Sequence, residues 1–472
     1  MSKGNLWQRY WDVTSVAQTA HRGESIPSLI IKGLQSMLVM FGATIIVPLT
    51  LGMSPQVTLF GMGTGTLLFL LMTKGKSPLT MGSSFAFMIG VLGIIDAAGG
   101  PFAGDAFTHY DRLQYALGGI VAAGGVYLIF SVIVKLVGAE KFMNVLPHAV
   151  TGPTVVLIGV TLAPHAINQF ATNWILGPLT LAVVIGIMMF GKGKLKLYPI
   201  LVGFVGVYFV AVMMQLAGAT TPAGDPLVNF YAVRQAQLFG LPPFMAPRFH
   251  IIPILMLAPF SLATISENIA DHVIVGAEMG EDLVREKPGL SRTLFADGVQ
   301  SMVAASFGTP MNTTYSENVG LLIITKVFSS IVVAIGAVFA IILGLSPAFA
   351  EIIRSIPVSI IGGASVMLYG MIASIGMRNI KEHVDLNVTK YLIIMSVMLV
   401  IGIGMRFGTP IVVQIAQENV RLDRMNLPVA IIMGVILNVI LPHAPTGAKK
   451  ANPAEVEKVE EAEEVTEVAE EE

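Results

Sequence analysis

Four carboxylates in this sequence stand within long apolar stretches: Glu267, Asp271, Asp297 and Glu317. An ionisable side chain at membrane depth is costly, so each is a candidate for ligand binding or proton transfer. Glu267 and Asp271 are four residues apart in FSLATISENIADHVIVG, and this spacing places them on one face of a helix. Asp297 serves equally well as a structural partner, and His272 is interpreted as a packing residue because it points away from Glu267.

A second polar segment, NTTYSENVGLLIITK, spans residues 312–326 and interrupts apolar surroundings. A half-helix that begins near Ser316 would point unpaired backbone N–H groups into the protein interior. Ser316 is expected to act through its N–H rather than its hydroxyl, with Glu317 as an acceptor beside it. Gly320 is expected to allow a close backbone approach. Donors and acceptors without a basic cluster suit a neutral polar ring better than an anion.

The composition is that of a membrane protein: 54% of the 472 residues are hydrophobic and 12% are charged, against about 25% charged in soluble domains. Continuous apolar runs predict an all-α polytopic protein rather than a β-barrel. The absence of cysteine excludes thiolate metal sites, disulfides and cysteine nucleophiles. The sequence has no phosphate-binding loop and no nucleophile–base motif, so we expect neither an enzyme nor a metal or cofactor.

We predict fourteen membrane segments, which places both termini on one side. Lysine and arginine are concentrated in the loops on the side of the termini, which predicts cytoplasmic termini and an inner-membrane, multi-pass location. The segments are 28–51, 56–73, 77–98, 114–138, 146–168, 174–191, 198–219, 250–276, 292–308, 311–325, 327–349, 357–377, 387–404 and 425–442.

A long Pro- and Gly-containing break divides the segments into seven and seven, so the halves must have opposite orientations, as in the inverted repeats of transporters. The expected parts are a cytoplasmic N-terminal segment 1–27, a first repeat 28–219, an extracytoplasmic linker 220–249, a second repeat 250–442 and an acidic disordered tail 443–472. The third segment is broken at Gly82–Ser84 and the tenth is short and polar. Broken segments at matched positions predict a substrate site between them.

Several motifs in order resemble the nucleobase/ascorbate transporter family over residues 28–442, and NTTYSENVG resembles its bacterial uracil-type members. Purine-type members usually have glutamine where Glu317 stands. The matching stretches are MFGATIIVP (40–48), GSSFAF (82–87), SENIADH (266–272), KPGLSRTLFADG (287–298), ENVGLLIITK (317–326) and LYGMI (368–372).

The resemblance implies a core domain (segments 1–4 and 8–11), a gate domain (segments 5–7 and 12–14) and short antiparallel strands in segments 3 and 10. It implies that Glu267 and Glu317 bind the base through their side chains, that Phe85 and Ser316 offer backbone N–H groups, and that Tyr369 faces the site from the gate domain. Further residues implied at or around the site are Asp271, Asn318, Gly320, Thr325, Gly82 and Ser84.

The implied activity is uptake of a nucleobase, uracil first, with protons as the coupling ion through Glu267 and Glu317. Uracil-type members commonly have histidine where Asp271 stands, which keeps xanthine, uric acid or another purine as the alternative. The first segment has Gln35-Ser36 where the family usually has Gln-His. An anion transporter of related fold and an ion channel are further alternatives. The implied partners are membrane lipid and a second copy through the gate domain, without nucleic acid.

Three arginines near the C-terminal end, Arg406, Arg421 and Arg424, are interpreted as parts of a solvated outer loop.

Overall fold

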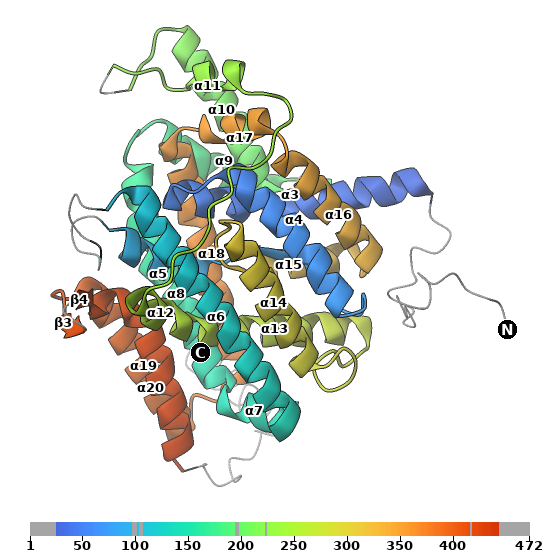
Figure 1. Ribbon diagram of the computed structural model, residues 1–472, viewed down its shortest axis with the longest axis vertical. Coiled ribbons are helices and arrows are strands. Elements are labelled where there is room, and N and C mark those ends of the chain that lie inside the picture. The colour runs from blue at the N-terminus through green and yellow to red at the C-terminus, as the bar shows by residue number, and fades with distance from the viewer. Residues whose placement is uncertain are drawn as a thin grey trace, which may run out of the picture.

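The computed structural model describes residues 25–96, 102, 107–193, 198–221, 224–415 and 418–442. Most of the predicted N-terminal segment and all of the predicted acidic tail lie outside these ranges. The described chain is mostly helical, which confirms the predicted fold class (Figure 1). The helices are α3 (Ile26–Leu51), α4 (Pro55–Met72), α5 (Phe85–Ile95), α6 (His109–Val137), α7 (Ala139–Val145), α8 (His148–Phe170), α9 (Leu176–Phe190), α10 (Pro199–Leu216), α11 (Phe230–Gln235), α12 (Ile251–Leu257), α13 (Ser261–Met279), α14 (Leu290–Ser306), α15 (Ser316–Thr325), α16 (Ser330–Gly344), α17 (Pro347–Arg354), α18 (Val358–His383), α19 (Thr389–Phe407) and α20 (Asn426–Ile440).

Every predicted segment coincides with helix, but the helices differ in length. Within the described ranges, nine helical stretches are long and apolar enough to cross a membrane, or ten if the bent pair α16 and α17 is one span. The segments that fall short are those built from short helices, such as α5 and α15. The count of fourteen crossings therefore stays a prediction.

Local signals explain where several helices begin and end. α3 and α4 each begin with proline in the first turn, where the missing N–H costs no hydrogen bond. α3 ends at Gly52, whose φ of 68° is the left-handed conformation that glycine adopts without strain. α6 begins with a capping box, in which Thr108 and Asp111 satisfy each other's backbone N–H groups.

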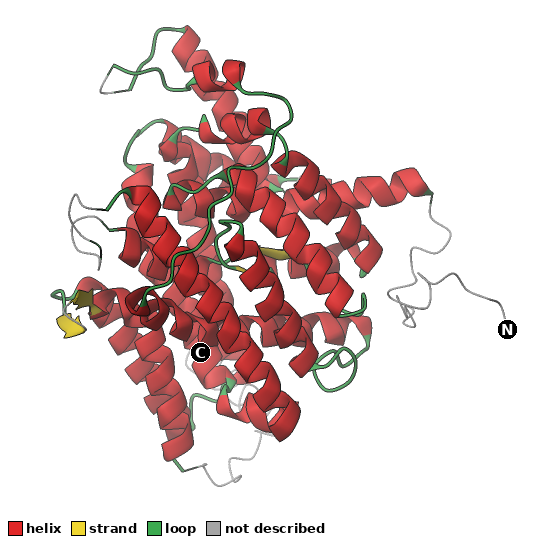
Figure 2. Cartoon of the chain, viewed as in Figure 1, coloured by secondary structure: helices red, strands yellow, loops and turns green. Residues whose placement is uncertain are grey.

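The two broken segments meet in the middle of the protein. Strand β1 (Met81–Ser83) pairs antiparallel with β2 (Asn312–Thr314), and the pair lies among the helices in Figure 2. The Ser84 N–H extends the pairing by donating to the Met311 carbonyl at 2.8 Å. α5 starts directly after β1 and α15 directly after β2, so two helix N-termini flank one buried strand pair.

The long helices form two groups by their packing, and the core and gate domains stay a prediction. In the first group α6 packs on α14, and α4 and α3 pack on α16; in the second, α8 packs on α18 and α19, α9 on α18, and α19 on α20. If each segment corresponds to the one seven places later, the pair α6–α14 corresponds to α16–α4, and the pair α9–α18 corresponds to α19–α8. These matching pairs support the prediction of an inverted repeat.

The predicted linker runs over helices of the first group (Figure 1). The hydrogen bonds that hold its backbone include Gly240 N–H to the Leu345 carbonyl, Met245 N–H to the Phe307 carbonyl and Arg248 N–H to the Gln114 carbonyl, at 2.8–3.0 Å. The linker therefore joins the two halves and also fastens helices of both halves within the first group.

Candidate functional site

The first turn of α15 lies against the face of α13 that carries the two carboxylates. The Ser316 Oγ is 2.8 Å from Oδ1 of Asp271 and 3.3 Å from Oε1 of Glu267. Asp271 is buried, while Glu267 and Ser316 are half-buried. The helix face that was predicted to carry both carboxylates therefore contacts the start of the predicted half-helix. The use of the Ser316 hydroxyl was not expected from the sequence, which pointed to the backbone N–H.

Two aromatic side chains among the predicted site residues, Phe85 and Tyr369, contact each other. The rings of Phe85, at the start of α5, and Tyr369, on α18, contact edge to face with centroids 5.6 Å apart. Phe85 is 8% exposed and Tyr369 is 1% exposed. Phe85 lies in the predicted core domain and Tyr369 in the predicted gate domain, so this ring contact crosses the predicted boundary beside the N-terminus of α5.

Glu317 is placed by its backbone in the first turn of α15, directly after Ser316. Its side chain lies outside the described part of the structure. Its predicted role as a ligand for the base therefore remains a prediction.

A buried polar network fixes the strand pair to α13 and α14. Asp297 accepts hydrogen bonds from the side-chain amides of Asn268 and Gln300, both at 2.8 Å. Gln300 also donates to the Asn312 carbonyl at 3.0 Å, and the Asn312 amide donates to the Gly61 carbonyl at 3.1 Å. Of the two roles open to Asp297, this geometry supports the structural one.

We expect Asp297→Ala to reduce stability by about 2 kcal/mol or more, because two buried amide donors would lose their acceptor. Asp297→Asn keeps one acceptor oxygen and should cost less. Thermal unfolding of the detergent-purified variants measures both effects. A stable Asp297→Ala variant that no longer binds its ligand would assign this carboxylate to the binding site instead.

His272 is a packing residue, as its position on the helix predicts. It is fully buried, and both ring nitrogens have partners: Nδ1 lies 2.7 Å from the Asn268 carbonyl and Nε2 lies 3.0 Å from the Ser77 Oγ. A carbonyl only accepts, so Nδ1 carries a proton, whereas the serine hydroxyl can either donate to Nε2 or accept from it. The ring joins α13 to the segment before β1.

The residues of the predicted supporting motif have separate structural roles. The Asn318 amide donates to Thr80 Oγ1 at 2.9 Å, and the Thr325 hydroxyl donates to the Leu321 carbonyl at 2.8 Å. A Cβ at Gly82 would overlap the ring of Tyr315, so this strand position requires glycine. These contacts hold α15 and β1 in place.

No neighbouring element of the protein makes a close approach at Gly320, so its predicted role beside a ligand stays a prediction. A Cβ built there meets no atom within 4 Å. Gly320 instead borders a cavity of about 220 Å³ between α3, α10, α15 and α18, where the two helix groups face each other. The sequence shows that a glycine is present but not which neighbour it faces.

The interpretation of the arginines as a solvated loop is wrong for Arg421 and Arg424. Arg424 pairs with Asp96 at 2.8 Å, and Arg421 pairs with the buried Asp423 at 2.6 Å. Arg406 is half-buried and donates to the Thr161 carbonyl. Asp96 ends α5 and Arg424 precedes α20, so the first pair connects the two helix groups on the face where α3 ends.

We expect Asp96→Asn and Arg424→Gln each to destabilise the protein by about 1–2 kcal/mol, because each leaves one partly buried charge without this partner. The double variant should be about as stable as either single variant. Thermal unfolding of the two single variants and the double variant measures the interaction between the two side chains. Additive losses would show that the two side chains contribute independently.

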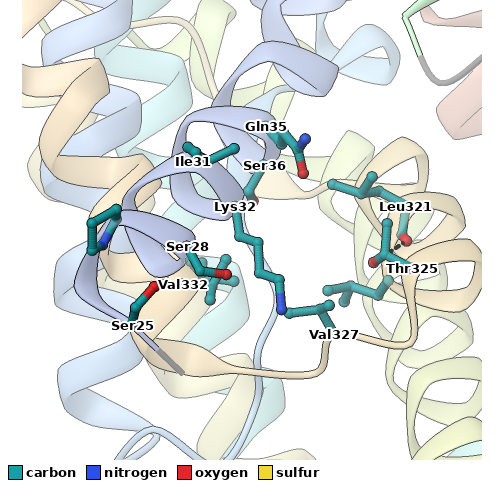
Figure 3. Close-up of a pocket in the computed structure, with 13 residues that line it drawn as sticks. Ser25, Ser28, Ile31, Lys32, Gln35, Ser36, Leu321, Thr325, Val327 and Val332 are labelled. Carbon is teal, nitrogen blue, oxygen red and sulfur yellow. Dashed lines mark hydrogen bonds between the residues drawn. The ribbon is translucent and has the colours of Figure 1, made fainter. Parts of the chain in front are cut away.

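Figure 3 shows a cavity of about 630 Å³ bounded by the start of α3, the end of α15 and the start of α16. The Lys32 side chain reaches across it toward Val327. The cavity lies at the C-terminal end of α15, the end remote from Ser316, and neither Glu267 nor Asp271 lines it. We therefore place the candidate site at the N-terminus of α15 and not in this cavity.

Within the described ranges, no three His, Asp or Glu side chains come together in a way that could hold a metal ion.

Outside the membrane segments, the loop after α13 is ordered by Asp282. Its carboxylate accepts from the backbone N–H groups of Arg285 and Val284, and these bonds lower the pKa of Asp282.

Comparison with known proteins matches the chain over nearly its whole length. The model of a permease family matches residues 27–411. The uracil permease of Bacillus subtilis is 36% identical over 431 residues, covering 87% of this chain and 92% of the relative. The putative pyrimidine permease RutG of Escherichia coli is 34% identical over 380 residues, covering 79% of this chain and 82% of the relative.

Solved transporters share the fold at low sequence identity. The transmembrane domain of a cyanobacterium bicarbonate transporter, BicA, aligns with a TM-score of 0.59 and 14% identity, covering 89% of this chain and 98% of that one. The murine anion transporter Slc26a9 in the inward-facing state aligns with a TM-score of 0.54 and 12% identity, covering 93% of this chain and 72% of that one.

The fold is therefore shared with solved membrane transporters, and the sequence is similar to that of permeases. The chain belongs to this permease family, the nucleobase/ascorbate transporters, and is a multi-pass membrane transporter rather than an enzyme.

Proposed function

We propose that this protein imports a nucleobase, uracil first, across the inner membrane together with a proton. The observation that carries the proposal is the pair of carboxylates, Glu267 and Asp271, held together at the N-terminus of the half-helix α15. The relatives named uracil permease support the same substrate. Both termini are proposed to be cytoplasmic.

Uracil offers two N–H donors and two carbonyl acceptors around a planar ring. Carboxylates of Glu267 and Glu317 would accept from the N–H groups, and backbone N–H groups at Phe85 and Ser316 would donate to the carbonyls. A buried polar edge left unpaired would cost affinity, so a site with both kinds of group selects such a ring. Tyr369 would cover the ring from the gate side.

Proton coupling follows from the carboxylates. Two of them close together in a low-dielectric site interact strongly and titrate as a unit. One bound proton would reduce their repulsion when the neutral base is present. Movement of the core group relative to the gate group would then expose the site to each side in turn.

The second candidate substrate is a purine such as xanthine or uric acid. Asp271 supports it, because uracil-type members of the family commonly have histidine at this position.

We propose a homodimer through the gate group as a further expectation from the family.

Uptake of labelled uracil into proteoliposomes tests the function. We expect unlabelled uracil to compete, with xanthine, hypoxanthine and ascorbate competing weakly, and accumulation to collapse when the proton gradient is removed. Stronger competition by xanthine would move the substrate to the purines. Accumulation that follows a sodium gradient and ignores the proton gradient would contradict proton coupling.

A further inference from the structure

The Ser316 hydroxyl lies between two carboxyl groups that are one helical turn apart on α13. Its oxygen is 2.8 Å from Asp271 Oδ1, a usual O–H···O distance, and 3.3 Å from Glu267 Oε1, a longer contact. Ser316 is the first residue of α15, and Tyr315 before it is extended. This side chain therefore connects the start of the half-helix to α13.

The number of protons decides which states of the three groups are favourable. A hydroxyl has one proton to donate, whereas an ionised carboxylate only accepts. Two hydrogen bonds among three oxygens need two protons, and the serine supplies one. The second must come from Glu267 or Asp271. With both carboxylates ionised, the single hydroxyl proton would be shared between two acceptors in a weaker three-centre bond, with two negative charges on either side of it.

Two singly protonated arrangements satisfy both contacts. Protonated Glu267 can donate to Ser316 while Ser316 donates to Asp271, or protonated Asp271 can donate to Ser316 while Ser316 donates to Glu267. The two differ by the transfer of one proton through the hydroxyl, which gives up its own proton as it receives another. Atoms and charge balance, since one carboxyl group loses the proton that the other gains.

We propose that Ser316 is a positioning residue that joins Glu267 and Asp271 into one singly protonated unit and thereby fixes the acceptor that Glu267 presents to the ligand. The part of this inference that concerns the ligand rests on the proposed nucleobase transport. The joining of the three side chains does not depend on it.

Other ionisable groups around the unit are separately engaged or on other helices. Both oxygens of the nearby Asp297, on α14, accept from amides. Tyr127, on α6, is buried close enough to Glu267 and Asp297 to interact with them electrostatically. Glu317 follows Ser316 on α15, and its side chain lies outside the described part. On α13 itself, both ring nitrogens of His272 have partners, the Ser77 hydroxyl and the Asn268 carbonyl.

The first test compares Ser316→Ala with Ser316→Thr, which keeps the hydroxyl. We expect Ser316→Ala to raise the half-saturating uracil concentration about tenfold, the size expected for a lost hydrogen bond to a charged group, with a smaller change in maximal rate. Ser316→Thr should restore it to within about twofold of the original value. Ser374→Ala is the matched control, because Ser374 is an exposed serine on α18 whose hydroxyl donates to its own helix at Gly370.

The second test is a cycle of Ser316→Ala, Asp271→Ala and the double variant. If the serine acts through Asp271, the double variant falls no further than Asp271→Ala alone, whereas independent sites give multiplied losses. Multiplied losses, or a Ser316→Thr variant that behaves like Ser316→Ala, would overturn the proposal.

The same cycle measured by thermal unfolding without ligand separates this inference from the function. If the unmodified protein transports none of the nucleobases, the proposed function fails. Non-additive unfolding temperatures in the cycle would still support the three-residue unit, and additive ones would reject it.

Discussion

Glu267→Gln is expected to lower uracil uptake about a hundredfold at equal protein level, the effect of losing a buried hydrogen bond to a charged group. Glutamine has the same shape but replaces one acceptor oxygen by an NH₂ donor. Facing an N–H of the base, that donor would repel it. Facing Ser316, it would donate to the hydroxyl as a protonated carboxyl group does, but the side chain could no longer take up or release a proton.

Glu278→Gln is the matched control for this substitution. Glu278 lies near the end of the same helix, and its carboxylate pairs with Lys326 instead of approaching Ser316. The control should keep uptake within about twofold of the original, because an exposed ion pair contributes little. Equal uptake by Glu267→Gln and the unmodified protein would remove Glu267 from the site.

Gly82→Ala is expected to destabilise the fold by about 3 kcal/mol, at the upper end of the usual cost of overpacking. The added Cβ would overlap the ring of Tyr315, which follows the partner strand β2. Neither can retreat easily, because β1 and β2 are paired and their register aligns Gly82 with Thr313. Thermal unfolding and the yield of monodisperse protein in detergent measure the loss.

Gly320→Ala is the matched control, since it makes the same change at a helical glycine with open space around it. No atom lies within 4 Å of the new Cβ. Alanine should stabilise the helix by up to about 1 kcal/mol, because glycine is the poorer helix former. If the two alanine variants were equally stable, the crowding at Gly82 would not govern the stability of the strand pair.

Much of the architecture could be predicted because it depends on local sequence. Apolar run length set the helical segments, and Gly82 to Ser84 and the polar stretch after Met311 marked where two of them break. The shared face of Glu267 and Asp271 follows from a spacing of four residues on one helix. These properties involve neighbours in the chain, whose relative positions are fixed by backbone geometry.

The partners across the fold could not be predicted in the same way. Ser316 meets Asp271 across 45 residues, and Arg424 meets Asp96 across 328. The sequence indicated neither the serine hydroxyl as a bridge nor the ion pair between Asp96 and Arg424, and it did not show that Gly320 borders a cavity.

The sequence by itself thus determined the class of protein, the helical segments, the two breaks and the carboxylates that face one way, because hydropathy and helical periodicity are properties of short stretches. Only the tertiary structure decided which groups those carboxylates meet, that Asp297 is held within the scaffold, and that Arg424 is paired. The physical reason is that such contacts depend on how α13, α14, α15 and the strand pair pack together, and that packing is set by the shapes of many side chains at once.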